Sequence, residues 1–229
     1  SFVRDPADIY TLRTLTANKV PLIAKIEMSE AVDKLADIVK VSDGIMVARG
    51  DLGVEMPMED VPIVQKRCIA LAREKAKPVI VATQMLDSMM NNSRPTRAEA
   101  TDCSTAVLDG ADALMLSAET AAGKYPLEVI RSMVRTINSV EKQAKIYYKF
   151  RPIDRQSPLF VHDSLIMAAC KLAEEVGAKA IVGLTQSGYT AFKSSSHRPN
   201  ANIFAFTANQ ALLNTLSLVW ATKTYFYNK

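Results

Sequence analysis

Short apolar runs alternate with longer stretches of helical periodicity along most of this chain. Four such runs, near residues 22–27, 44–49, 78–83 and 112–117, are each followed by ten or more residues with apolar side chains at helical spacing. Strands that alternate with helices at this spacing form parallel sheets, because a parallel connection needs a long crossover that is usually helical. The pattern therefore predicts an α/β fold built from successive βα units.

The helical stretches of the first part have recognisable starts. We expect helices near residues 6–17, 29–40, 61–76, 95–109 and 126–144. Prolines lie where proline fits the first turn of a helix, and a serine is placed to cap the helix at 29–40; these residues are Pro6, Pro62, Pro95, Pro126 and Ser29.

The pattern breaks near residues 146–158, where aromatic, charged and proline residues replace the apolar periodicity. A second α/β part follows, with helices near 162–176, 189–196 and 209–218, strands near 179–184 and 202–206, and a further strand beginning near 224. The predicted organisation is a first part at 1–145, a linker at 146–158 and a smaller α/β part at 159–229.

Composition narrows the class of protein. Hydrophobic residues make up 48% and charged residues 23% of the 229, which is typical of a globular chain with a core. The formal charge of +4 is scattered, so we expect neither a nucleic-acid partner nor a membrane partner. Three widely spaced cysteines, without a CxxC pair, indicate a reduced, zinc-free, cytoplasmic protein; they are Cys68, Cys103 and Cys170.

Polar residues follow each of the four apolar runs in the first part. Lys25 and Glu27 end the first run and project from one face, because side chains two positions apart on a strand point the same way. Residues 48–53 end the second, 82–84 the third and 117–119 the fourth. The carboxyl ends of parallel strands lie on one side of a sheet, so we expect these groups to converge on one substrate.

Each of these features also has a purely structural interpretation. Lys25 with Glu27 could be a structural ion pair, and Gly50 with Asp51 could be only a turn. A functional interpretation takes Gly50 as a point of close backbone approach and pairs Asp51 with Glu27 as oxygen ligands for Mg²⁺ or Mn²⁺. Thr83 could simply pack, and Ser117 and Glu119 have a similar structural interpretation.

Two further segments carry polar residues at helix starts. The run at 94–99 (RPTRAE) predicts a well-capped helix start with an acid in its first turn. In the second part, Thr185, Ser187, Gly188 and Thr190 link a strand to a helix, and hydroxyls with a glycine at such a position suit a phosphate.

Five segments of the first part together resemble the pyruvate kinase family. They are residues 24–27 (AKIE), 42–55 (SDGIMVARGDLGVE), 78–86 (PVIVATQML), 94–99 (RPTRAE) and 109–121 (DGADALMLSAETA). The second part resembles the family's C-terminal regulatory domain from 162 through 187–191 (SGYTA) and 197–199 (HRP). The resemblance implies an α/β fold consisting of the C-terminal half of a (β/α)8 TIM barrel, followed by a partial α/β regulatory domain.

The activity that the resemblance implies is phosphoryl transfer from phosphoenolpyruvate to ADP, giving pyruvate and ATP, with Mg²⁺ (or Mn²⁺) and K⁺. Lys25 then matches the lysine that neutralises the phosphoryl group in flight and the enolate. Glu27 and Asp51 match the Mg²⁺ ligands, the amides of Gly50 and Asp51 would hold the substrate carboxylate, and Thr83 would contact it and organise protonation. Arg49, Gln84, Ser117 and Glu119 would surround these groups.

The resemblance starts inside the family's barrel, so we expect a fragment of a longer enzyme. The family's first four strands, its lid domain, the phosphate-binding arginine and the K⁺ ligands have no counterpart in this chain. We therefore expect the 229 residues alone to lack kinase turnover. For the intact enzyme we expect a homotetramer and a phosphorylated allosteric effector bound at the loop of Thr185, Ser187, Gly188 and Thr190.

Three alternatives stay open at this point. A metal-dependent aldolase could use the same cation and carboxylates to stabilise an enolate. Lys25 could form a Schiff base, although two metal-binding acids beside it argue against this. The chain could also be a catalytically incompetent binding or oligomerisation module that pairs with a full-length subunit.

Overall fold

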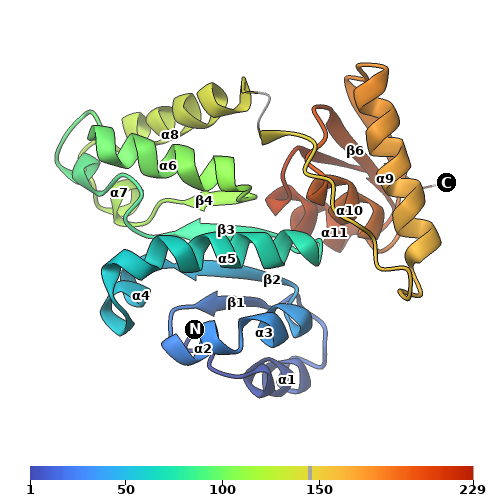
Figure 1. The fold of residues 1–229 in the computed structure, drawn as a ribbon. Coiled ribbons are helices and arrows are strands. Elements are labelled where there is room, and N and C mark those ends of the chain that lie inside the picture. The colour runs from blue at the N-terminus through green and yellow to red at the C-terminus, as the bar shows by residue number, and fades with distance from the viewer. Residues whose placement is uncertain (144–145, 229) are drawn as a thin grey trace. The chain divides into compact units, whose positions relative to one another are not determined.

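The computed structural model describes residues 1–143 and 146–228. The chain divides into two compact units, Ser1–Ala144 and Lys145–Lys229, and each is considered by itself (Figure 1). The first part was predicted to end at residue 145, and residues 144, 145 and 229 lie outside the described residues.

The described residues of the first unit hold a parallel sheet with the order β1-β2-β3-β4. Its strands are β1 (Ile23–Ile26), β2 (Gly44–Ala48), β3 (Val79–Ala82) and β4 (Ala113–Met115). β3 is buried on both faces, which explains its unbroken apolar sequence. The predicted βα units and their parallel pairing are confirmed, and all four strands end at one side of the sheet (Figure 1).

Helices follow the strands as the periodicity predicted. They are α1 (Pro6–Leu15), α2 (Ser29–Asp33), α3 (Leu35–Val41), α4 (Arg49–Glu55), α5 (Val61–Glu74), α6 (Arg97–Asp109), α7 (Ala118–Ala121) and α8 (Pro126–Glu141), with short 3₁₀ turns η1 (Met58–Asp60) and η2 (Asp87–Met90). Helix α5 packs on β2 and β3 (Figure 1). Pro6, Pro62 and Pro126 lie in first turns, as expected, because the missing N–H has no intrahelical partner there.

Three local expectations were wrong. The helix predicted at 29–40 is divided at Lys34, which leaves helical geometry (φ −100°, ψ 18°) while its ammonium pairs with Asp5. Ser29 is the first helical residue, and Met28 takes the cap position. Arg49 does not extend β2; residues 49–55 form helix α4, so the glycines at 50 and 53 lie in a helix and not in a turn.

Helix α6 begins with a capping box. The Thr96 hydroxyl accepts the Glu99 N–H at 3.2 Å, and the Glu99 carboxylate accepts the Thr96 N–H at 2.7 Å. The same carboxylate accepts the N–H and hydroxyl of Ser88, from η2, at 2.7 and 2.6 Å. The predicted well-capped start is confirmed, although the helix begins at Arg97 and Pro95 precedes the cap. Glu99 therefore ties η2 to α6.

This carboxylate makes stability depend on pH. Burial raises the pKa of Glu99, but the hydrogen bonds from Ser88 and Thr96 outweigh it and hold the pKa below its ordinary value. A lowered folded-state pKa gives stability that is present above the unfolded pKa of about 4.3 and is lost as the pH falls through the folded pKa. We expect Glu99→Gln to lower the free energy of unfolding by about 1 kcal/mol near neutral pH, because the bonds from Ser88 and Thr96 are stronger to a charged carboxylate than to a neutral amide oxygen.

Urea unfolding of both proteins between pH 7 and pH 3 measures this difference. It should shrink as the pH falls, because protonated Glu99 comes to resemble glutamine. Glu55→Gln, at an exposed carboxylate at the end of α4, is the control. A Glu99→Gln difference that stays constant over the whole pH range would show that the capping charge contributes nothing.

The second unit contains a smaller parallel sheet with the order β5-β6-β7. Its described elements are α9 (Phe160–Glu175), β5 (Ala180–Leu184), α10 (Tyr189–Ser196), β6 (Asn202–Thr207), α11 (Gln210–Thr215), η4 (Leu216–Leu218) and β7 (Thr222–Phe226). Residues predicted as a linker pair with this unit, because the N–H groups of Tyr148 and Lys149 donate to the carbonyls of Arg198 and His197. No helix among the described residues has the length and apolarity needed to cross a membrane.

Candidate active site

A lysine between two carboxylates lies where β1 and β2 end. The Lys25 ammonium donates to Glu27 Oε2 through a short bond and to Asp51 Oδ2 at 2.8 Å. The Glu27 side chain is only 2% exposed and also accepts the backbone N–H of Phe2. Asp51, in α4, is 54% exposed. The structure thus brings together three of the predicted site residues, with one charge facing solvent and one buried.

The pairing fixes the charge states of the exposed members. Hydrogen bonds from Lys25 to Asp51 and Glu27 raise the pKa of Lys25 above its ordinary value. The hydrogen bond from Lys25 holds the pKa of Asp51 below its ordinary value. Lys25 is therefore an ammonium and Asp51 a carboxylate at neutral pH, so this lysine is a fixed positive charge and offers no free amine.

The donor set of this cluster suits a hard cation. Glu27 and Asp51 both bond the same ammonium, so their oxygens point to a common position. Among residues 1–143 and 146–228, no group of three or more histidine, cysteine, aspartate or glutamate side chains could hold a metal. Mg²⁺ is commonly bound by one or two carboxylates, with waters and substrate oxygens completing its shell. Two carboxylates, of which Glu27 is buried and Asp51 is exposed, fit that pattern.

Gly50 and Thr83 meet at the neighbouring strand ends. The Gly50 N–H donates to Thr83 Oγ1 at 2.9 Å, and the Thr83 hydroxyl donates to the Ala82 carbonyl at 2.7 Å. A Cβ at position 50 would lie 3.3 Å from Thr83 Oγ1, which is closer than an ordinary contact. The approach of Thr83 therefore favours glycine at this position. The Gly50 amide that was predicted to hold a carboxylate thus has a hydroxyl oxygen as its acceptor here.

Arg49 connects this pair to the rest of the unit. Its Nη2 donates to the carbonyls of Thr83 at 2.9 Å and Gln84 at 3.2 Å, and its Nη1 bonds the Asp102 carboxylate of α6. The Arg49 side chain is 11% exposed. Arg49, predicted to surround the site, therefore contacts the backbone of Thr83 and that of the adjacent Gln84.

Ser117 and Glu119 behave differently. Glu119 is 2% exposed and accepts the N–H of Ser117 at 2.7 Å and of Leu86 at 3.3 Å. These bonds tie the segment after β4 to the segment after β3. The contacts of Glu119 in the described part of the chain are thus structural, and they do not include Lys25 or Asp51.

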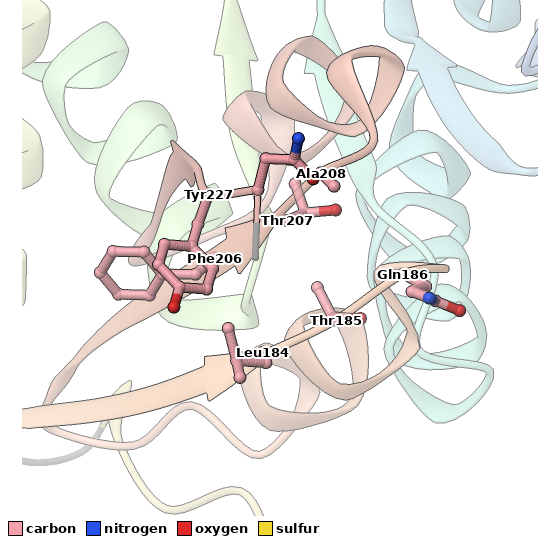
Figure 2. Close-up of a pocket in the computed structure, with 8 residues that line it drawn as sticks. Leu184, Thr185, Gln186, Phe206, Thr207, Ala208 and Tyr227 are labelled. Atoms are coloured by element: carbon pink, nitrogen blue, oxygen red, sulfur yellow. The ribbon is translucent and has the colours of Figure 1, made fainter.

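In the second unit, the predicted phosphate loop follows β5. The Thr185 hydroxyl accepts the Gly188 N–H at 2.9 Å, and the Ser187 hydroxyl accepts the Tyr189 N–H at 3.4 Å. Gly188 has φ 81°, a left-handed conformation that favours glycine. The loop borders a cavity of about 350 Å³ (Figure 2), which is lined by Leu184, Thr185, Gln186, Phe206, Thr207, Ala208, Tyr227 and Asn228.

Tyr189 fixes the start of the following helix. Its hydroxyl donates to Asp163 Oδ1 at 2.6 Å, and Lys193 pairs with the other oxygen of Asp163 at 2.9 Å. Burial and the neighbouring carboxylate raise the pKa of Tyr189, so it remains a neutral hydrogen-bond donor. Thr190 is the second residue of the same helix.

Two residues that bond the site, Phe2 and Asp102, were not predicted from the sequence. The Phe2 N–H reaches Glu27 across 25 positions, and Asp102 reaches Arg49 across 53. No periodic signal marks either contact. One feature of the sequence did point to the second contact. Arg49 directly follows a buried strand, and a cation in such a place usually needs an acidic partner, which here is Asp102.

The chain matches two family models. One is described as "Pyruvate kinase, barrel domain" and matches residues 1–130; the other, "Pyruvate kinase, alpha/beta domain", matches residues 163–229. With the parallel sheets described above, these matches confirm the predicted fold class: α/β, with part of a (β/α)8 barrel followed by a second α/β domain.

Individual proteins are similar over the whole chain. A pyruvate kinase of Mycobacterium tuberculosis is 49% identical over 232 residues, covering 100% of this chain and 48% of that protein. A pyruvate kinase of Corynebacterium glutamicum is 47% identical, covering 98% and 47%. A crystal structure of a pyruvate kinase from Cryptosporidium parvum superposes with a TM-score of 0.93 at 37% identity, covering 100% of this chain and 49% of that one. The chain spans about half the length of the curated relatives it matches.

Proposed function

This chain belongs to the pyruvate kinase family, and on that premise we propose that its strand-end cluster takes part in phosphoryl transfer from phosphoenolpyruvate to ADP, the last step of glycolysis. The observation that carries the proposal is the Lys25 ammonium between Glu27 and Asp51, beside the paired Gly50 and Thr83, at the ends of adjacent parallel strands. Such strand ends are where barrel enzymes bind their substrates.

Lys25 would act as a fixed positive charge. Its raised pKa keeps it protonated, and its side chain is 29% exposed, so a substrate anion can approach it. Phosphoryl transfer proceeds through a loose transition state, in which positioning and charge neutralisation do most of the work. Lys25 would therefore stabilise the transferring phosphoryl group and the enolate left behind.

Glu27 and Asp51 would hold Mg²⁺ or Mn²⁺. When bound, such an ion supplies Lewis-acid polarisation of substrate oxygens. The burial of Glu27 and its bond to the Phe2 amide would fix one ligand oxygen, while exposed Asp51 can adjust to the substrate. We also propose that K⁺ is required, with its ligands supplied from outside these 229 residues.

Gly50 and Thr83 would orient the substrate carboxylate. The Gly50 N–H donates to Thr83 Oγ1 and the Thr83 O–H donates to the Ala82 carbonyl, so a carboxylate oxygen that accepts the amide would free a lone pair of Oγ1. The amide of Asp51 would add a second donor. The Thr83 hydroxyl, turned from the Ala82 carbonyl towards the enolate, would organise its protonation to pyruvate.

We propose that the site is completed by residues outside this chain. The curated relatives are about twice as long, and in the described residues β1 and β4 are the edges of the first sheet. Open edges of a parallel sheet are normally paired or covered. The missing strands would supply the phosphate-binding arginine, the K⁺ ligands and much of the nucleotide site. We place the complete enzyme in the cytoplasm as a homotetramer.

The loop after β5 would bind the phosphate of an allosteric effector. Two residues at the start of this loop, Thr185 and Gln186, line the cavity of about 350 Å³ in Figure 2. The residues that we assign to this contact are Thr185, Ser187, Gly188 and Thr190. Their amides and hydroxyls are hydrogen-bond donors of the kind that bind phosphate oxygens.

A Schiff-base aldolase is disfavoured by the same cluster. A lysine that attacks carbonyls needs a lowered pKa, whereas the two carboxylates raise the pKa of Lys25. A metal-dependent aldolase would not require ADP, so the cosubstrate separates it from a kinase.

The test is pyruvate formation from phosphoenolpyruvate by the natural full-length protein, with ADP, Mg²⁺ and K⁺ each omitted in turn. We expect turnover that requires ADP and Mg²⁺, and no turnover by the 229 residues alone. Pyruvate formation without ADP, or none with all components present, would contradict a kinase. Robust turnover by the 229-residue monomer would contradict the proposal that residues outside this chain complete the site. Copurification of an inactive chain with a full-length subunit would favour a binding module.

A further inference from the structure

Two consecutive residues after β3 have an unusual backbone conformation. Thr83 has φ 67° and Gln84 has φ 53°, both in the left-handed region. Neither is glycine, and a β-branched residue is strongly disfavoured there by its Cβ. Such conformations persist only where surrounding contacts hold them, and they cluster at functional sites.

Arg49 supplies the holding contacts. A single nitrogen, Nη2, donates to the carbonyl oxygens of both strained residues, at 2.9 Å to Thr83 and 3.2 Å to Gln84, and lies 2.8 Å from Met85 Sδ. These carbonyls belong to successive residues, and in the left-handed turn both of them reach the same nitrogen. The planar guanidinium suits this arrangement better than a lysine ammonium would.

Asp102 orients the guanidinium. Its carboxylate bonds Nη1, the nitrogen that does not contact the strained carbonyls. The pair joins the start of α4 to the middle of α6, at a side chain that is 11% exposed. A charge-assisted bond of this kind fixes the orientation of the group as well as its position.

The arrangement is not the one that stability alone would select. Arg49 Nε is buried and has no hydrogen-bond partner among the described residues. Burying an unsatisfied donor and holding two left-handed residues both cost free energy. Proteins retain such costs where function needs the geometry.

We propose that Arg49, oriented by Asp102, is a positioning residue that holds Thr83 and Gln84 in the left-handed conformation and so aims the Thr83 hydroxyl at the Gly50 amide. Because Gly50 N–H and Thr83 Oγ1 are 2.9 Å apart, a small change of the turn would separate them. An effect of Arg49 on catalysis rests on the proposed function, in which Gly50 and Thr83 bind the substrate carboxylate. The effect of Arg49 on the backbone of Thr83 and Gln84 does not rest on it.

Hydrogen exchange, followed by mass spectrometry in the natural full-length protein, tests the structural part. We expect Arg49→Lys to speed exchange in a peptide spanning residues 49–53 by about tenfold or more, while peptides from α3 stay protected, because the opening is local. We expect Asp102→Asn to act in the same direction. Unchanged exchange at 49–53 in Arg49→Lys overturns the proposal, and unchanged exchange in Asp102→Asn overturns the role of Asp102.

A rescue experiment separates strain from simple packing. Glycine adopts positive φ without penalty, so adding Gln84→Gly to Arg49→Lys should restore slow exchange to within about threefold of the parent. Adding Gln84→Ala removes the same side-chain contacts but keeps the Cβ, and it should not rescue. Equal rescue by both, or by neither, would overturn the strain-holding role.

Kinetics then connect the turn to the substrate. We expect Arg49→Lys to raise KM for phosphoenolpyruvate about tenfold, and Gln84→Gly but not Gln84→Ala to reverse it. An exchange pattern as expected with no detectable kinase turnover in the parent would leave the positioning role intact and overturn the proposed function. Unchanged hydrogen exchange in Arg49→Lys, together with kinase turnover by the parent, would overturn the positioning role and leave the proposed function intact.

Discussion

Replacing Lys25 with methionine is expected to lower kcat for pyruvate formation by the natural full-length protein about 10²–10³-fold, the range seen when one preorganised stabilising group is removed from an active site. Methionine keeps most of the volume but removes the charge that faces Glu27 and Asp51. The loss should fall mainly on kcat, because the charge is needed most where the phosphoryl group is in flight.

Steady-state kinetics check this result at a temperature where circular dichroism shows the variant folded. Lys34→Met is the matched control, because Lys34 is also a lysine paired with a carboxylate, Asp5, but both partners are exposed and lie on other elements. The control should keep its kcat, since exposed pairs contribute little. A Lys25→Met protein that retains more than about a tenth of the parent kcat would rule out a central role for this charge.

The same substitution is expected to destabilise the first unit strongly. Glu27 is 2% exposed, so removing the Lys25 ammonium leaves a buried carboxylate that keeps the bond from the Phe2 amide and loses the one from Lys25. Breaking a buried ion pair from one side costs about 3–5 kcal/mol, chiefly through the charge left behind. We expect a decrease of that size in the free energy of unfolding, measured in urea on the natural full-length protein.

A double variant identifies the cause. Lys25→Met combined with Glu27→Gln removes both charges, while the glutamine oxygen can still accept the Phe2 N–H. We therefore expect the double variant to be more stable than Lys25→Met alone by about half of the loss or more, because neutralising both partners of a buried pair is often nearly neutral. A double variant less stable than the single one would show that the cost comes from packing and not from the orphaned carboxylate.

Much of the first unit could be predicted from local pattern. Apolar runs of strand length and amphipathic stretches between them located β1 to β4 and most of the helices, because strand and helix periods are properties of neighbouring residues. Errors arose where a tertiary contact overrode the pattern. Lys34 divides a predicted helix while it pairs with Asp5, and Arg49 leaves the strand to begin α4.

The predicted site residues fall into two groups in the structure. Lys25, Glu27 and Asp51 meet as expected, because strand parity and parallel alignment are enough to place residues at the ends of neighbouring strands. Glu119 also follows a strand, yet it turns inward to the amides of Leu86 and Ser117. Position at a strand end predicts proximity to the rim but not the direction of the side chain.

Residue pattern was enough to predict the succession of strands and helices along the chain, the strand ends at which polar groups gather and the family likeness. Three features emerged only from the folded chain: Glu27 is buried and accepts the Phe2 N–H, Thr83 and Gln84 adopt left-handed backbone, and Arg49 reaches Asp102 across 53 positions. The difference lies in how far along the chain the responsible interactions extend. Periodicity reflects neighbours within a few residues, whereas burial, strained dihedrals and distant ion pairs depend on which segments pack together after folding.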